Sequence, residues 1–168
     1  MASLGQSAGI SSVSKEVIEL LFPGLIDSGF SIMSPETPEY NCIAWTAGDT
    51  EAWWEPDPFN LGYWPSNAPR EFSINAYIKA YETLGYTRSE NAEYEEGFEK
   101  IVIFVDPNGK PTHAARQLNS GKWTSKLGQL EDIEHSLEGL VGSQYGSIGI
   151  YMKRPGSRGY SKIKGRHG

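Results

Sequence analysis

The chain has 168 residues and a formal net charge of −6 at neutral pH. Hydrophobic residues make up 38% and charged residues 21%, a balance typical of one globular domain and not of a disordered or membrane chain. No apolar run approaches the roughly 18 residues that cross a bilayer, and the N-terminus lacks the cationic start and apolar stretch of a secretory signal. We therefore expect a cytoplasmic protein without a membrane partner.

The charges are distributed unevenly along the chain. Residues 153–168 contain six basic side chains and no acidic one, which leaves nine basic against 21 acidic residues elsewhere. An acidic body repels nucleic acid, so we expect no nucleic-acid partner. We interpret residues 156–168 as a flexible basic tail and the Ser- and Gly-rich residues 1–12 as a disordered lead. Residues 13–155 then form a single domain.

The first part of this domain has helical patterns. Ser14 is a suitable N-cap for a short amphipathic helix that Pro23 and Gly24 end. After a loop with several prolines, Asn41 is a favoured N-cap for a second helix, CIAWTA, which Gly48 terminates. This arrangement places Cys42 in the first helical turn.

Residues 49–72 combine aromatic side chains with four prolines and cannot form a regular element. We expect a lid that lies beside the Cys42 helix. Trp53, Trp54 and Trp64 offer large faces with a polar edge, so they are candidates for substrate binding. The alternative is a loop that simply covers the core.

The second part of the domain changes from a helical to a strand pattern. Ser73 caps a helix over residues 74–81, in which apolar side chains recur at helical spacing. Residues 98–127 predict a three-stranded antiparallel meander with turns at Asn108-Gly109 and Ser120-Gly121. A helical stretch over 130–141 and a last strand over 147–153 that closes the sheet complete the chain. Helices followed by a sheet indicate an α+β fold.

Cys42 is the only cysteine, and its predicted position favours a reactive thiolate. His113 follows on a later strand, in the order in which a nucleophile and a base occur in papain-like enzymes. Ser125 and His135 are candidates for the third catalytic residue. The alternatives are that Cys42 is a small buried apolar residue and that His113 makes a structural hydrogen bond.

Metal and cofactor chemistry have little support in the sequence. Cys42, His113 and His135 could supply three zinc ligands in number, but their spacing matches no CxxC, HxH or HExxH motif. No glycine-rich loop matches a phosphate cradle. We therefore expect neither a metal nor a cofactor.

A series of sequence blocks resembles a family of uncharacterised bacterial proteins over residues 39–154. The blocks are YNCIAW, YWP, GFEKIVIFVD, PTHAARQL, KWTSKLG, DIEH and a YG before the last strand. At the level of the fold, the same order is similar to the NlpC-type branch of papain-like cysteine peptidases. That resemblance implies N-terminal helices packed on an antiparallel sheet, with Cys42 as nucleophile, His113 as base, and Ser125 or His135 as orienting residue.

Two hypotheses of function follow from the sequence. The first is a papain-like thiol hydrolase that cleaves a peptide, amide or thioester bond through Cys42 and His113. The second is a non-catalytic module of the same fold, in which the Trp-rich loop binds a peptide or protein partner and Cys42 is structural. The position of Cys42 relative to His113 distinguishes them.

Overall fold

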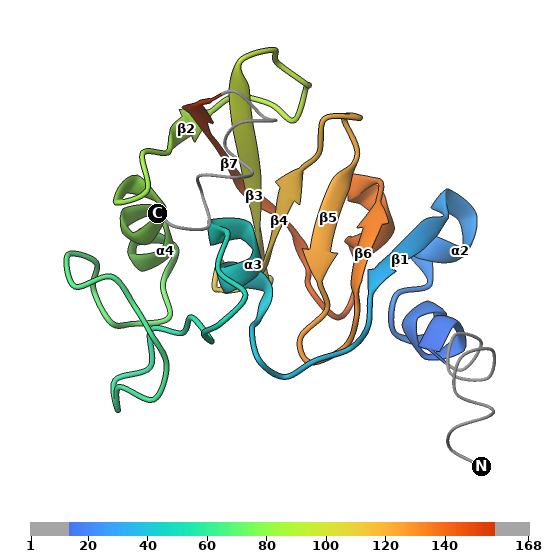
Figure 1. Ribbon diagram of the computed structural model, residues 1–168, viewed down its shortest axis with the longest axis horizontal. Helices are drawn as coiled ribbons and strands as arrows, with labels where there is room; N and C mark the ends of the chain where they lie inside the picture. Colours follow the sequence, from blue (N-terminus) through green and yellow to red (C-terminus); the bar gives the residue numbers. More distant parts are fainter. Residues whose placement is uncertain (1–13, 157–168) are drawn as a thin grey trace.

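The computed structural model describes residues 14–156. Its centre is a seven-stranded sheet in the order β1-β6-β5-β4-β3-β7-β2, in which neighbouring strands pair antiparallel (Figure 1). The strands are β1 (Phe30–Ser34), β2 (Thr87–Ser89), β3 (Phe98–Val105), β4 (Pro111–Gln117), β5 (Trp123–Lys126), β6 (Asp132–His135) and β7 (Ser147–Pro155).

Short helices cover both faces of the sheet. They are α2 (Gly24–Ser28), α3 (Cys42–Ala47), α4 (Ile74–Glu82) and the 3-10 helix η1 (Leu137–Leu140), and residues 14–21 are also helical. Together with the sheet they make an α+β fold, as the sequence predicts. Within the described part of the chain, no helix has both the length and the apolar character needed to span a lipid bilayer.

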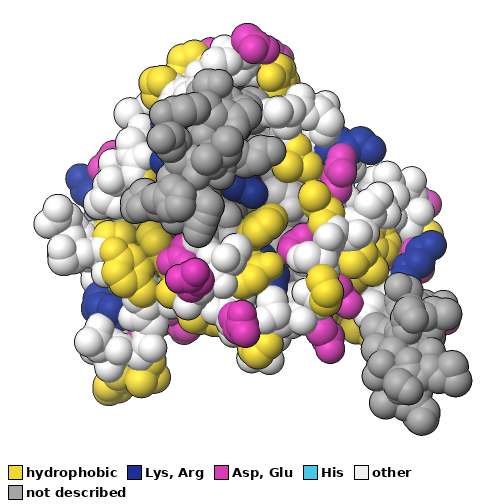
Figure 2. Space-filling view, in the orientation of Figure 1, with side chains coloured by type: hydrophobic (Ala, Val, Ile, Leu, Met, Phe, Trp, Pro, Cys, Tyr) yellow, Lys and Arg dark blue, Asp and Glu magenta, His cyan; other side chains and the backbone are white. Residues whose placement is uncertain are grey.

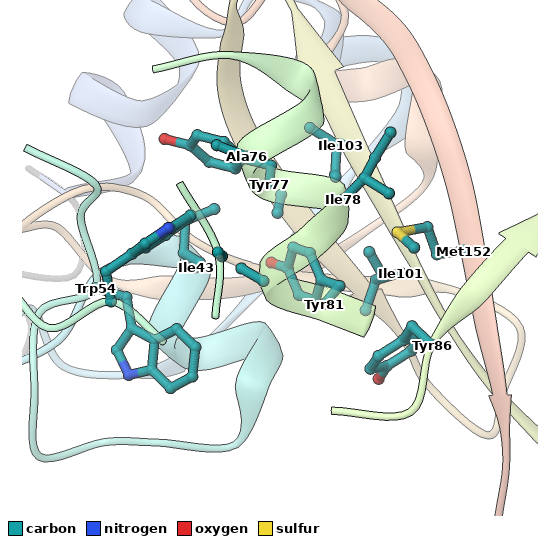
Figure 3. Packing of buried hydrophobic residues seen from close by; sticks show 14 of the residues in the cluster. Ile43, Trp54, Ala76, Tyr77, Ile78, Tyr81, Tyr86, Ile101, Ile103 and Met152 are labelled. Atoms are coloured by element: carbon teal, nitrogen blue, oxygen red, sulfur yellow. The ribbon is translucent and has the colours of Figure 1, made fainter. Parts of the chain in front are cut away.

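Alternate residues of the central strands point to opposite faces, and each face has its own core. On the α3/α4 face, Ile101 and Ile103 pack with Tyr77 and Tyr81 of α4 (Figure 3). Ala114 belongs to the same core. We call the other side the α2/η1 face. Its core contains alternate residues of the same strands together with side chains from the N-terminal helices and η1. These residues include Val102, Phe104, Ala115, Ile18, Leu25 and Leu140.

The predicted meander over residues 98–127 is confirmed as β3, β4 and β5. Its turns contain Gly109 and Gly121, whose φ angles of 84° and 92° lie in the left-handed region that glycine adopts without strain. The predicted helices are also found at α3 and α4. Asn41 and Ser73 cap them by accepting the amide hydrogens of Ala44 and Ala76.

Two sequence-based predictions about the sheet are wrong. Residues 130–141 are not one helix: Asp132–His135 form strand β6, and only Leu137–Leu140 are helical. The last strand, β7, does not close the sheet but lies between β3 and β2. Strand β1 was not predicted, since its residues are mostly exposed and lack a clear alternating pattern.

Candidate functional site

Asn41 joins the start of α3 to the Trp-rich loop. Its Oδ1 accepts the amide hydrogens of Ala44 and Trp54, each at 3.1 Å, and its Nδ2 donates to the main-chain oxygen of Trp54 at 2.7 Å. One side chain therefore caps the helix and fixes the loop against it. The prediction that this loop lies beside the Cys42 helix is confirmed.

Cys42 occupies the first turn of α3 and packs against the core of the α3/α4 face. Burial raises the pKa of its thiol to about 11, although backbone N–H groups, that of Ala114 among them, favour the thiolate. The predicted activated thiol is therefore not supported. A helix of six residues does not offset the loss of water around the sulfur.

The other three candidate catalytic residues form a hydrogen-bonded chain, which we call the polar chain. His113 Nε2 lies 2.9 Å from Ser125 Oγ, and Ser125 Oγ lies 2.7 Å from His135 Nε2. His135 Nδ1 lies 2.8 Å from the main-chain oxygen of Ser136. All three side chains of the polar chain are buried, and the ring of His113 stacks on that of Tyr145 at 3.9 Å.

The sheet separates Cys42 from the polar chain. His113 pairs with Phe104 in β3 and contacts its ring, so it lies on the α2/η1 face. Its neighbour Ala114 packs on the α3/α4 face, which is the face that Cys42 contacts. The structure thus brings together His113, Ser125 and His135, but it does not bring Cys42 into hydrogen-bonding contact with any of them.

The environment of the two histidines keeps them uncharged at neutral pH. Burial lowers the pKa of His135 to about 4. Burial and the nearby His135 hold the pKa of His113 well below its usual range. A general base works best with a pKa near the operating pH, so neither imidazole has the properties of one.

The Trp residues proposed for substrate binding are largely part of the core. Trp64 is 4% exposed; its Nε1 donates to the main-chain oxygen of Pro69 at 2.8 Å, and its ring meets Tyr77 edge-on. Trp54 is also buried, and only Trp53 is partly exposed. Trp54 and Trp64 therefore have little surface to offer a ligand.

The same loop exposes other apolar side chains that the sequence analysis missed. Phe59 and Leu61 are 81% and 84% exposed, and we call this pair the apolar tip. The signal was present in the segment DPFN, where Asp is a turn-forming residue. The Asp57 carboxylate accepts the amide hydrogens of Leu61 at 2.8 Å and Gly62 at 3.0 Å, and these bonds hold the pKa of Asp57 below its usual range.

Arg70 bonds to the backbone on both sides of the apolar tip. Its Nη1 donates to the main-chain oxygen of Asp57 at 2.8 Å, and its Nη2 donates to that of Gly62 at 2.7 Å. Two further backbone bonds, both 2.9 Å, join Tyr63 to Trp53 and Glu55. The loop is therefore fixed in shape although its tip extends into solvent.

Residues 14–156 contain no group of three or more His, Cys, Asp or Glu side chains arranged to hold a metal ion. The polar chain has two imidazoles and one hydroxyl, and the hydroxyl of Ser125 bonds to one ring nitrogen of each histidine. The arrangement as a whole offers an apolar surface for contact and a buried hydrogen-bond network.

These features define an α+β domain with a mostly antiparallel sheet and a projecting, internally bonded loop. The chain belongs to the family described as domain of unknown function DUF7689, whose family model matches residues 31–153, from β1 into β7. This match agrees with the expectation of an uncharacterised family. Neither the comparison with curated proteins nor that with solved structures found a match.

Proposed function

We propose that this domain is a non-catalytic interaction module that binds a protein partner through the apolar tip. The exposure of Phe59 and Leu61 at the end of a bonded loop is the observation on which the proposal rests. A scattered exposed apolar residue needs no explanation, but two at the end of a fixed projection form a contact surface. Figure 2 shows this projection at the lower left, with apolar side chains at its end.

The fixed shape of the loop favours binding. Association costs free energy when it orders a flexible loop, and a loop held in its bound shape avoids that cost. Here Asp57 and Arg70 supply the internal hydrogen bonds. Phe59 and Leu61 can then enter an apolar pocket of the partner with little loss of backbone freedom.

The charges around the apolar tip indicate the partner's chemistry. Residues 49–71 contain five acidic side chains and one basic side chain, Arg70, which is already bonded within the loop. A partner that presents an apolar pocket with Lys or Arg at its rim is therefore complementary. The acidic residues are Asp49, Glu51, Glu55, Asp57 and Glu71.

Thiol hydrolysis has less support in the geometry. It requires a thiolate and a base in contact, whereas the pKa of Cys42 is raised and His113 lies on the other face of the sheet. The binding hypothesis needs only a structural Cys42. It also accounts for Trp54 and Trp64 as the residues that attach the loop to the core.

The experiment introduces a photo-crosslinking amino acid at Phe59 to identify the partner, and then measures its affinity by calorimetry. We expect Phe59→Ser and Leu61→Ser each to raise Kd by at least about tenfold, since each removes a buried contact. Leu20→Ser is the matched control, because Leu20 is 81% exposed but lies in the N-terminal helix. Equal effects of Leu61→Ser and Leu20→Ser would contradict the proposal. Peptidase or esterase activity that Cys42→Ser abolishes would replace it with thiol hydrolysis.

A further inference from the structure

The polar chain has one consistent arrangement of hydrogens. The main-chain oxygen of Ser136 only accepts, so His135 carries its proton on Nδ1 and accepts from Ser125 at Nε2. Ser125 has one hydrogen to donate, so it must accept from His113 Nε2. His113 Nδ1 is then an unprotonated nitrogen, and it is buried without a hydrogen-bond partner. Every proton position in the polar chain depends on both imidazoles being neutral.

The polar chain crosses a weak point of the sheet. Strands β4 and β5 pair through the backbone at Arg116–Thr124 and Gln117–Trp123. His113 and Ser125 lie beyond this short ladder, and their side-chain hydrogen bond joins the two strands there. Ser125 and His135 then extend the connection to β6. We call the junction of β4 and β5 the seam.

We propose that the polar chain is a proton-operated latch, in which protonation of His113 and His135 opens the seam between β4 and β5. A proton on His135 Nε2 removes the acceptor of Ser125. A proton on His113 Nδ1 places a charge where the structure provides no acceptor. The first event leaves the Ser125 hydroxyl hydrogen without an acceptor, and the second buries an unpaired charge, so each makes the closed arrangement less stable relative to the open one. The low pKa of both imidazoles in the closed protein agrees with this argument.

The surroundings of the latch oppose charge on the imidazoles. In the described structure, the titratable groups that bear on them are each other, Tyr145 and Glu138 of η1. Glu138 favours a charged His135, but burial outweighs it. The elements packed on this face otherwise contribute apolar side chains. These include Phe104 of β3, Ile18 and Phe22 of the N-terminal segment, Leu25 of α2 and Leu140 of η1.

Cys42 provides a reporter for the seam on the other face. Helix α3 spans the two strands, because Cys42 lies beside the backbone of Ala114 in β4, while Trp45 Nε1 donates to Thr124 Oγ1 in β5 at 3.1 Å. Separation of the strands therefore disturbs α3 and increases the exposure of the half-buried Cys42. Cys42 is the only cysteine and is half-buried in the closed protein, so the increase in its labelling rate above the rate at pH 7.5 measures this opening.

The test follows labelling of the full chain by 4,4′-dithiodipyridine from pH 7.5 to pH 5, with rates divided by those of the urea-unfolded protein. If both histidines have ordinary pKa values of about 6.5 in the open form, opening takes up two protons below about pH 6. The normalised labelling rate should then rise by up to about a hundredfold for each unit by which the pH falls. We expect His113→Gln and His135→Gln each to reduce the rise to about tenfold per unit. His167→Gln removes the third histidine, which lies outside the described residues, and should leave the slope unchanged.

A second control separates the latch from general loss of stability. Ile133→Val in β6 shortens a buried side chain on the same face, so it should raise labelling at every pH without changing the slope. Histidine NMR of the unmodified protein should also show that His113 and His135 remain neutral in the closed form above pH 5. A normalised labelling rate that is independent of pH, or an unchanged slope in both histidine variants, would overturn the proposal. So would ordinary titration of both imidazoles near pH 6.5.

Discussion

Arg70 and Asp57 hold the Trp-rich loop in shape through a bond from a guanidinium to a main-chain oxygen, with Arg70 Nη1 at 2.8 Å from the Asp57 carbonyl. Arg70→Met keeps most of the aliphatic stem but removes both donors. We expect hydrogen exchange at the amides of Leu61 and Gly62 to accelerate by at least about tenfold, because the loop opens locally. The urea midpoint of the domain should change little. Lys79→Met, at an exposed ion pair in α4, is the control that should leave these amides unchanged.

Substitutions at the apolar tip should affect stability much less than a substitution at Trp64, which attaches the same loop to the core. Phe59→Ser and Leu61→Ser alter exposed side chains, so we expect changes within about 0.5 kcal/mol. Trp64→Ala removes a buried indole and its hydrogen bond, so we expect a loss of roughly 3–5 kcal/mol. Urea unfolding followed by circular dichroism measures both. A large loss in either tip variant would mean that the tip is part of the core.

Cys42 should be a slow nucleophile in the native protein. Its pKa of about 11 means that little thiolate exists at pH 8, so iodoacetamide should react more slowly with native than with unfolded protein. The pKa of this thiol is higher in the folded protein than the value of about 8.5 expected in the unfolded protein. The thiol therefore stabilises the folded state below about pH 8.5, and this contribution is lost as the pH rises toward 11. Cys42→Ala should reduce that loss at high pH. Rapid alkylation of native protein below pH 8 would contradict this prediction.

His135 should make the domain sensitive to mild acid. The pKa of His135 is about 4 in the folded protein and about 6.5 in the unfolded protein. Its contribution to the free energy of unfolding is therefore present above about pH 6.5 and is lost as the pH falls toward 4. The expected loss from this residue between pH 6.5 and pH 5 is roughly 2 kcal/mol. Urea unfolding at the two pH values, compared between the unmodified protein and His135→Gln, measures it. The same pH dependence in both proteins would show that other groups are responsible.

Lys126 should be important for the loop that precedes α3. Its side chain is buried, and Nζ donates to the main-chain oxygens of Thr37 and Gly128 at 2.7 and 2.6 Å. Lys126→Met keeps the stem but leaves both oxygens without this donor, so we expect a loss of about 1–3 kcal/mol. The measurement is the free energy of urea unfolding. Lys110→Met, at an exposed position, should have little effect.

Local chemistry explains which elements the sequence could predict. Asn41 and Ser73 are of residue types that are strongly preferred at helix N-caps. The glycines at 109 and 121 supply the positive φ angles that their turns need. These signals involve residues close together in the chain. They were sufficient for α3, α4 and the meander.

The remaining features depend on contacts between distant residues. Strand β6 contains Asp132 and His135, both buried, and a polar strand of this kind is recognisable only once its neighbours β1 and β5 are known. The face on which His113 lies depends on register, since a shift of one residue would have turned it toward Cys42. The grouping of His113, Ser125 and His135 could be proposed from sequence, but their separation from Cys42 could not.

The interior position of β7 has a consequence for synthesis on the ribosome. Residues 147–155 complete the hydrogen bonding of both β3 and β2, so β2 has no partner strand and β3 has only β4 until the last part of the domain has been translated. At a translation rate of about 5–20 residues per second, the edge of β3 that later pairs with β7 remains unpaired for several seconds. A nascent chain stalled before residue 147 should therefore bind chaperones, whereas one released after residue 155 should fold without them.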